Sequence, residues 1–508
     1  MSCCCAPKAP ENDDREDDDA TFGHFASSTS AHGFARVVGS RYLIFKIFWA
    51  LLILAGFSIA SINIRDRFLS FLRHDTTTKM SMIFPKKLQF PAVTICNANK
   101  YNQKLLTEND EKFLNSTASI LFSLEYGDDY GDDYDYAEYG DEDYSDDSYP
   151  YSDQIYADGA RTLEQELNAL MADINQWYPD GFDMEKFTKE KGWTLNDENL
   201  VCSFRGFPCN ASEDFTHVFT QFGNCYTFNG DGALYRYQDQ AGAGRGLTLG
   251  IDIEQDSYSN KLSRGDRMDA GIFFQVHSQF EPPSVEAYGR AVPPGFHAYA
   301  GLIRKDSSTM EPPYGDCNAS STLDYHAVYT MSGCVAECKL GHMMDRCGCK
   351  LMHLPGPGAT CSPEIMLSCI RPLMGEIKRS FSKMCECEVP CSSVLFETSL
   401  SYAAIPSEST KAELALELGT TVENARKNYV IIDVYFESLN YVESVQMQAV
   451  EVTGIISDIG GQFGLFMGFS LLTIVEFLEF GVLRIISLLS KKPNKKVDVQ
   501  KINTNKNP

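Results

Sequence analysis

Lysine and arginine are both missing from the stretch of chain between Lys112 and Arg161. Within this gap the segment EYGDDYGDDYDYAEYGDEDYSDDSYPYSD, residues 125–153, contributes thirteen acidic residues to a net charge of −25. Binding to duplex nucleic acid requires clustered basic side chains that displace counterions from the phosphates. We therefore expect no nucleic-acid partner, and an acidic surface of this kind fits cations or cationic ligands better.

The motifs of the common hydrolases and nucleotide-binding enzymes are also missing. The sequence has no HExxH metalloprotease motif, no G-x-S-x-G nucleophile elbow and no phosphate-binding loop that ends in Gly-Lys-Ser/Thr. We therefore expect a protein that is not an enzyme, with no catalytic residues, no cofactor and no bound metal.

The N-terminus, MSCCCAPKAPENDDREDDDA, lacks the apolar core of a signal peptide, and Ser2 stands where myristoylation requires glycine. Cys3, Cys4 and Cys5 suit palmitoylation and free thiols equally well. Residues 1–40 are acidic, serine-rich and short of apolar periodicity, which predicts disorder. Membrane insertion is therefore expected to depend on spans inside the chain.

Two apolar stretches are long enough to cross a bilayer. The first is IFWALLILAGFSIASINI, within a predicted span 42–65, and the second covers residues 450–489. The basic tail 490–508 is typical of a cytoplasmic segment. With two spans, the N-terminal tail 1–41 is then also cytoplasmic and residues 66–449 are extracellular.

The composition of residues 66–449 supports an extracellular location. This region carries N-glycosylation sequons at Asn115, Asn210 and Asn318, and fourteen of the seventeen cysteines, an even number. Paired cysteines at short spacing also suit zinc, but the region has no spaced histidine pairs, so we predict disulfides. Spacing alone leaves their connectivity open.

The second span is unusually polar for an anchor. It holds Asp458, Glu476 and Glu479, and glycines at positions 460, 464 and 468 that recur every fourth residue. Charge inside a membrane segment persists mainly where it faces protein or water, and Glu476 and Glu479 share one helix face. The pattern predicts a pore lining with a ring of acids, with Asp458 nearer the outer mouth. The alternative is a packed anchor whose glycines make close helix contacts.

The extracellular region has a mixed α and β pattern. Period-two alternation predicts strands in the segments VCSFRGFPC, FTHVFTQFGNCYTFNG, GLTLGIDIEQDSY and GIFFQVHSQF, and β-branched residues predict further strands in LQFPAVTICN and VIIDVYFESLNYVESV. Amphipathic helices are predicted over residues 161–177, 181–191 and 409–429. The acidic insert 125–153 has too little aliphatic content to bury, so a solvated loop is predicted there.

Motifs in a fixed order identify a resemblance that runs nearly from end to end. In chain order they are HG at His32–Gly33, FPAVTICN at Phe90–Asn97, FGNCYTFN at Phe222–Asn229, PPYGDC at Pro312–Cys317, and GGQFGLFMGFS followed by TIVEFLEF in the second span. In this respect the chain resembles the degenerin and epithelial sodium channel family.

The resemblance implies an α+β membrane protein with two transmembrane helices per subunit, a disulfide-rich extracellular domain with a β-sheet palm and helical outer parts, and a trimer. It makes Gly468, Phe469 and Ser470 the selectivity filter of a sodium channel. It gives His32 and Gly33 a role in gating, and Ser457 the position where bulky residues hold such channels open. Phe469 is larger than the residue usual in the family, which leaves the sodium over potassium preference open.

The resemblance also implies a pairing for all fourteen extracellular cysteines. The implied pairs are Cys96 with Cys225, Cys202 with Cys209, Cys317 with Cys391, Cys334 with Cys387, Cys338 with Cys385, Cys347 with Cys369, and Cys349 with Cys361.

The sequences AHGFARVVGSR and WALLILAGFSIAS, on either side of the first membrane boundary, are most similar to the FMRFamide-gated sodium channels of molluscs and annelids. We therefore predict an amiloride-sensitive, plasma-membrane sodium channel, a homotrimer opened by an extracellular amidated neuropeptide. A proton-gated or constitutively active channel of the same family is the alternative, because crowded carboxylates acquire raised pKa values. A non-conducting, disulfide-rich receptor or adhesion protein is the second alternative.

Overall fold

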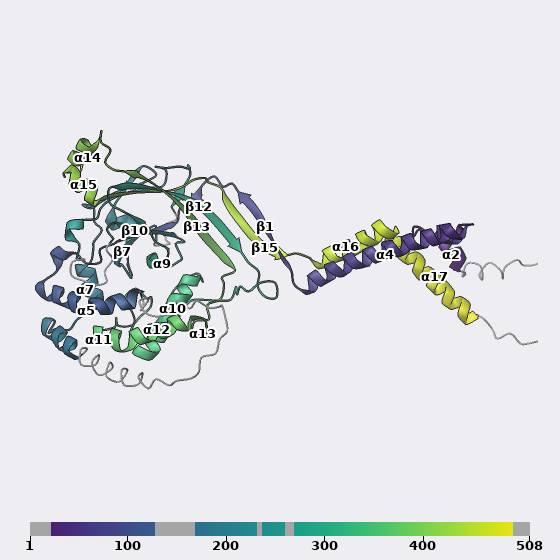
Figure 1. Ribbon diagram of the computed structural model, residues 1–508, viewed down its shortest axis with the longest axis horizontal. Helices are drawn as coiled ribbons and strands as arrows, with labels where there is room; N and C mark the ends of the chain where they lie inside the picture. Colours follow the sequence, from purple (N-terminus) through teal and green to yellow (C-terminus); the bar gives the residue numbers. More distant parts are fainter. Residues whose placement is uncertain (1–21, 127–167, 231–235, 260–268, 491–508) are drawn as a thin grey trace, which may run out of the picture. The chain divides into compact units, whose positions relative to one another are not determined.

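The computed structural model describes residues 22–126, 168–230, 236–259 and 269–490 (Figure 1). The chain divides into two compact units, one made of Met1–Thr77 with Met447–Pro508 and the other of Thr78–Gln446. The acidic insert 125–153 was predicted as a loop, but its first two residues, Glu125 and Tyr126, end a helix. The rest of the insert lies outside the described residues. The palmitoylation candidates Cys3, Cys4 and Cys5 also lie outside them.

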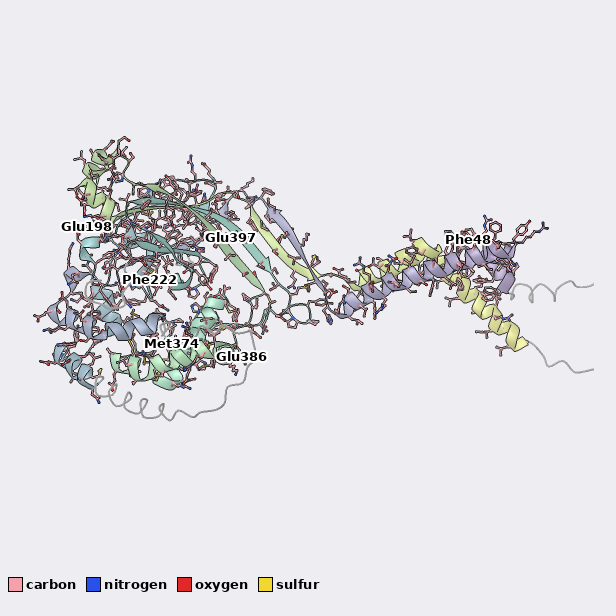
Figure 2. The ribbon with its side chains drawn as sticks, in the orientation of Figure 1. Phe48, Glu198, Phe222, Met374, Glu386 and Glu397 are labelled. Atoms are coloured by element: carbon pink, nitrogen blue, oxygen red, sulfur yellow. A yellow bond between two sulfur atoms is a disulfide. The ribbon has the colours of Figure 1, made fainter. Side chains whose placement is uncertain are left out.

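The first unit is helical. Its helices are α2 (Phe22–Ser28), α3 (Phe34–Gly39), α4 (Leu43–Leu72), α16 (Val452–Met467) and α17 (Leu471–Ser490). With 30 residues, α4 is about 45 Å long and continues seven residues beyond the predicted end at residue 65. Its surface is apolar, and Phe48, labelled in Figure 2, is 53% exposed. By length and composition α4 is the one described helix suited to cross a membrane.

The second predicted span is not one continuous helix. The 16 residues of α16 end at Met467, and α17 begins at Leu471. Neither half alone has the length and apolar composition of α4, because α16 is short and α17 carries Glu476, Glu479 and Arg484. The two-span topology therefore stays a prediction, and the break at residues 468–470 is the structural finding.

The second unit contains two large sheets. The first has the order β1-β15-β12-β14-β9-β4-β5, with β13 paired to β12. Its strands are β1 (Thr76–Ile83), β4 (Leu200–Phe204), β5 (Phe207–Cys209), β9 (Leu247–Asp252), β12 (Phe296–Ser308), β13 (Ser392–Ala404), β14 (Tyr429–Phe436) and β15 (Tyr441–Gln448). The central strand β12 runs parallel to β14 and β15 and antiparallel to β13.

The second sheet is antiparallel, in the order β11-β10-β3-β7-β6. Its strands are β3 (Ala92–Asn97), β6 (Phe215–Thr220), β7 (Gly223–Phe228), β10 (Ile272–His277) and β11 (Arg290–Val292); β2 (Leu88–Gln89) and β8 (Tyr237–Gln238) form a separate pair. Phe228 and Phe274 from this sheet join Ile251 and Phe436 from the first in one buried cluster. The two sheets therefore share a core.

Helices pack on a second apolar cluster in the same unit, which contains Phe113, Phe187, Met343 and Leu373. The larger ones are α5 (Glu108–Tyr126), a helix over residues 168–177, α7 (Met184–Lys191), α10 (Met331–Cys347) and α12 (Arg371–Arg379). Of the shorter helices, α11 (Pro363–Ile365), α13 (Phe381–Met384) and the π-helical segment η3 (Met366–Ile370) also contact this cluster. The other short helices of the unit are α8 (Ala211–Asp214), α9 (Val285–Tyr288), α14 (Lys411–Glu417) and α15 (Val422–Asn428), with 3-10 turns η1 (Gln103–Leu105) and η2 (Gln255–Ser257). Figure 1 shows α5, α7, α10 and α12 gathered on one side of the sheets.

Two predicted elements of the second unit are each divided in the structure. The helix expected over residues 409–429 forms α14 and α15, because Gly419 between them has φ +63°, a conformation that ends a helix. The strand expected over residues 430–445 forms β14 and β15, separated by residues 437–440. Repetitive apolar patterns gave the element types correctly and missed both interruptions.

Seven disulfides join all fourteen cysteines of the second unit, in the pairs that the family resemblance implies. They are Cys96–Cys225, Cys202–Cys209, Cys317–Cys391, Cys334–Cys387, Cys338–Cys385, Cys347–Cys369 and Cys349–Cys361. The ligand atoms of Cys338, His342 and Cys385 lie within 4.8 Å of one another. Both sulfurs are in a disulfide, so no thiolate remains there for zinc. The zinc alternative therefore has no site among these three residues.

Candidate functional site: the helix break at residues 468–470

The break lies at the three residues predicted as the selectivity filter. Gly468 caps α16 in the left-handed region, with φ +68°, and its N–H donates to the carbonyl of Gly464 at 3.0 Å. Glycine adopts this backbone without the penalty that a Cβ brings. Gly468, Phe469 and Ser470 are consequently non-helical, which interrupts the helical hydrogen-bond ladder in the middle of an apolar segment.

Ser470 begins the next helix. The Thr473 N–H donates to Ser470 Oγ at 3.3 Å, and the Ser470 N–H donates to Thr473 Oγ1 at 3.1 Å. This reciprocal pair is a capping arrangement that satisfies two backbone donors at the start of α17. The hydroxyl of Ser470 therefore has a structural role at the break, whatever role it has toward an ion.

The His-Gly motif lies against the same break. The N–H of His32 donates to the carbonyl of Met467 at 2.9 Å, the last residue of α16. A Cβ built on Gly468 would overlap the His32 imidazole, and Gly33 itself has φ +89°. Two predicted sites that are more than 400 residues apart in the chain are thus in direct contact, and glycine is required at 468 for two reasons.

Glu476 is held by the segment that precedes this motif. Its Oε2 accepts from Thr29 Oγ1 at 2.9 Å, from the Ser30 N–H at 2.9 Å and from Ser30 Oγ at 3.2 Å. The Ser30 hydroxyl also lies 2.6 Å from the buried Thr473 Oγ1. The carboxylate of Glu476 thereby ties the N-terminal segment to the first turns of α17.

Glu476 and Glu479 face one hollow, as expected for acids on one helix face. The hollow has a volume of about 310 Å³, and Phe25 and Phe480 line it as well. The rings of these two phenylalanines stack with centroids 4.4 Å apart. Glu479 is exposed, whereas the hydrogen bonds from Thr29 and Ser30 go to Glu476. The two acids of the pair therefore differ in how firmly they are held.

Asp458 is part of an ion pair. Its Oδ2 lies 3.4 Å from Nε of Arg67 on α4, with 41% and 59% of the two side chains exposed. Nearby, Asn63 Nδ2 donates to Gln462 Oε1 at 2.9 Å. The sequence placed Asp458 nearer the outer mouth and did not indicate this partner. Exposed pairs of this kind contribute little, from about 0 to 1 kcal/mol.

The close helix contact uses glycine and alanine on α4. Gly56 and Ala60 are buried, and a Cβ on Gly56 would lie 3.3 Å from the carbonyl of Phe466. On α16, a Cβ at Gly460 would meet no described atom within 4 Å. Of the three glycines of the predicted face, Gly460 is therefore open within one chain, whereas a Cβ on Gly464 would lie 3.6 Å from the carbonyl of Phe469 and one on Gly468 would meet His32. The small-x-x-x-small spacing of Gly56 and Ala60 was readable in the sequence and was missed.

Ser457 and the three sequons occupy exposed or half-exposed positions. Ser457 is exposed on α16, and its hydroxyl donates to the carbonyl of Thr453 at 3.0 Å. Asn115 is exposed on α5, and Asn210 caps α8 by accepting from the Glu213 N–H at 2.8 Å. Asn318 Nδ2 donates to Glu388 Oε2 at 2.6 Å. Their roles in gating and glycosylation stay predictions.

Several titratable groups of the second unit have shifted pKa values. Burial raises the pKa of Asp433, which accepts from the Gly244 N–H at 2.7 Å. Burial also raises the pKa of Glu254, with a smaller contribution from Asp252. His277, which is 4% exposed, has its pKa lowered by burial to about 4. No feature of the sequence pattern singled these groups out.

The sequence was compared with protein-family models and with known proteins, and it is similar to ion channels along most of its length. Residues 25–480 match the family model of the amiloride-sensitive sodium channel. The chain is 30% identical over 464 residues to acid-sensing ion channel 1 of Gallus gallus, covering 90% of this chain and 82% of that protein. It is 30% identical to acid-sensing ion channel 2 of Rattus norvegicus, with coverage of 90% and 85%. It is 31% identical over 468 residues to the bile acid-sensitive ion channel of Homo sapiens, with coverage of 90% and 85%.

Proposed function

Because the chain belongs to the amiloride-sensitive sodium channel family, we propose that it forms a sodium-conducting pore through the plasma membrane. The observation that carries the proposal is the non-helical break at Gly468, Phe469 and Ser470, located inside an apolar segment. Non-helical backbone at membrane depth is tolerated where it lines a water-filled path, and exposed carbonyls there can replace the hydration shell of an ion. The family consists of ion channels, so the expectation that the chain is not an enzyme is confirmed.

The proposed assembly is a homotrimer with both termini in the cytoplasm. The open glycine face around Gly460 on α16 would receive neighbouring subunits, because bare backbone permits close helix approach. Three copies would place Glu479 and the break around one axis. In that assembly Ser457 would line the closed pore, and Ser457→Phe is expected to leave a standing inward current.

We further propose that an extracellular amidated peptide of the FMRFamide type opens the pore. The support is the similarity of residues 31–41 and 49–61 to peptide-gated channels. Such a peptide carries an amino-terminal charge and an arginine, so the acidic extracellular region would raise its local concentration. Amiloride is the expected blocker.

Proton gating is the second candidate. Two observations favour it: relatives that share 30% identity over 90% of the chain are acid-sensing ion channels, and Asp433 and Glu254 have pKa values raised by burial. A raised pKa means that these carboxyl groups bind a proton at a higher pH than ordinary carboxyl groups do. Proton binding shifts a two-state equilibrium when the two states bind protons differently.

The test is voltage clamp on cells that express this chain alone. Amidated Arg-Phe peptides are applied at pH 7.4, and peptide-free buffer at pH 5 follows. The measurements are then repeated with external sodium replaced by potassium, and again with amiloride added. Current evoked by peptide at constant pH, carried by sodium and blocked by amiloride, is the expected result. Current on acid alone would replace peptide gating with proton gating.

The pore itself is tested separately from the gating stimulus. Ser470→Ala and Glu476→Gln are expected to alter conductance or ion preference whichever stimulus opens the channel. Conductance that is unchanged in both variants, at equal surface abundance, would contradict the pore assignment. Absence of any evoked current in the wild type and in both variants would favour a non-conducting receptor.

A further inference from the structure

A chain of aromatic rings crosses the helix break, and Phe469, the middle residue of the break, lies at its centre. The Phe469 ring is 6.0 Å from that of Phe463 on α16, with the two planes 16° apart, and 5.7 Å from that of Phe477 on α17, at 52°. These distances join ring centroids, and they fall in the range of about 4.5–7 Å in which aromatic side chains attract one another. Phe469 is half-buried. Its ring therefore packs between the two halves of the interrupted apolar segment.

The chain of rings continues into the other helices of the first unit. The ring of Phe463 lies 6.3 Å from that of Phe57 on α4. The ring of Phe477 lies 4.9 Å from that of Phe25 on α2 and 6.4 Å from that of Phe34 on α3. The helix before the break is thus connected to α4, the helix after it is connected to α2 and α3, and the ring at the break joins the two groups.

The backbone of Phe469 is bent back onto the end of α16. Its N–H donates to the carbonyl of Phe463 at 3.2 Å, and its own carbonyl lies 3.6 Å from the place that a Cβ on Gly464 would occupy. Figure 1 shows α16 alongside α4, and α17 turned away from α4 beyond the break. The direction of α17 relative to α16 therefore depends on contacts near the break, and the Phe469 ring makes one such contact to each helix.

We propose that Phe469 is a positioning residue for ion selectivity, whose ring, held between Phe463 and Phe477, fixes the backbone of the break in the conformation that prefers sodium over potassium. The inference rests on the proposed function, because it assigns a role within the same pore. Filter carbonyls replace the hydration shell of an ion, and a site keeps such a geometry only when packing locks the side chains around it. Phe477 lies outside the break, so its ring acts on selectivity only through that packing.

The test is the ratio of sodium to potassium permeability, measured from the reversal potential of the evoked current in cells that express the full-length chain. Phe469→Leu removes both ring contacts and is expected to lower the ratio about threefold or more. Phe477→Leu removes one of the two contacts and is expected to lower the ratio by a smaller factor. The double variant should lower it by less than the product of the two single effects, because the two variants remove one shared contact. Phe469→Tyr keeps the ring and is expected to retain most of the wild-type ratio.

Phe68→Leu, which removes a ring that is 49% exposed on α4, is the matched control and leaves the ratio unchanged. Surface biotinylation verifies that the variants reach the cell surface in equal amounts. An unchanged ratio in Phe469→Leu, an equal fall in Phe68→Leu, or effects of Phe469→Leu and Phe477→Leu that multiply independently would each overturn the inference. Where Phe469→Leu passes no current, the ratio in Phe477→Leu decides, and an unchanged ratio there overturns the inference. Failure of the pore proposal gives a different result, because the wild type itself would then carry no evoked current.

Discussion

The two units of this chain are stabilised by different means. The described part of the second unit has seven disulfides, two large buried apolar clusters and a smaller third one. The first unit, within the residues described, has a few hydrogen bonds around the helix break and leaves large apolar side chains of α4 and α17 exposed. Covalent links and buried area make the second unit a stiff scaffold, whereas a few polar contacts permit local rearrangement. Substitutions in the second unit should therefore affect folding, and substitutions at the break should affect conduction.

The largest effect is expected from a long-range disulfide of the second unit. Removing Cys96–Cys225, which closes a sequence separation of 129, should cost about 5 kcal/mol by loop-closure entropy. Removing Cys202–Cys209, with a separation of 7, should cost about 2 kcal/mol by the same model. Surface biotinylation of double serine variants measures the difference. Equal surface loss in both would show that loop length does not govern stability here.

The next largest effect is expected at the break. Gly468→Ala forces a Cβ into the left-handed region and into the ring of His32, so current should fall at least tenfold. Surface abundance should stay near wild type, because the second unit folds on its own disulfides and core. Gly481→Ala is the control, since a Cβ at Gly481 meets no described atom within 4 Å. Retained current in Gly468→Ala would contradict the packing described.

A smaller effect is expected from the N-terminal contact. Ser30→Ala removes the hydroxyl that joins Glu476 and Thr473, and hydrogen bonds to charged groups contribute about 1.5–3 kcal/mol. A double-mutant cycle of Ser30→Ala with Glu476→Gln, read out as the concentration or pH of half-maximal activation, should show coupling. Ser27→Ala is the control, because among the described residues the Ser27 hydroxyl donates only to the His24 carbonyl. Strict additivity would show that the contact does not affect opening.

The smallest effect is expected to be a pH dependence of the free energy of unfolding of the second unit. His277 has a folded pKa of about 4, below the ordinary value of 6.5. The unfolded chain therefore binds this proton first, and the stability contributed by neutral His277 is present above pH 6.5 and is lost as pH falls toward 4. Between pH 7 and pH 5 the loss is roughly 2 kcal/mol. Thermal unfolding of wild type and His277→Gln should diverge in this interval, and parallel pH curves would assign the loss to other groups.

The sequence alone determined which stretches are apolar, which cysteines belong to an oxidising compartment, and where a glycine motif lies in the second apolar stretch. These properties depend on the composition and local periodicity of each segment, which are the same whatever the fold. The same local patterns predicted which segments form strands and which form helices. They did not predict that the helical segment is divided at Gly419 or the strand segment at residues 437–440, because the apolar pattern continues across both turns.

Only the tertiary structure decided which polar groups form hydrogen bonds and ion pairs with one another. Glu476 meets Thr29 and Ser30, and Asp458 meets Arg67, although about 390 to 450 positions separate the partners in the chain. A cleft lined by β10, α9 and β13 arises where strands of the two sheets meet. Contacts of this kind depend on how distant segments are brought together, and no local pattern of residues specifies that.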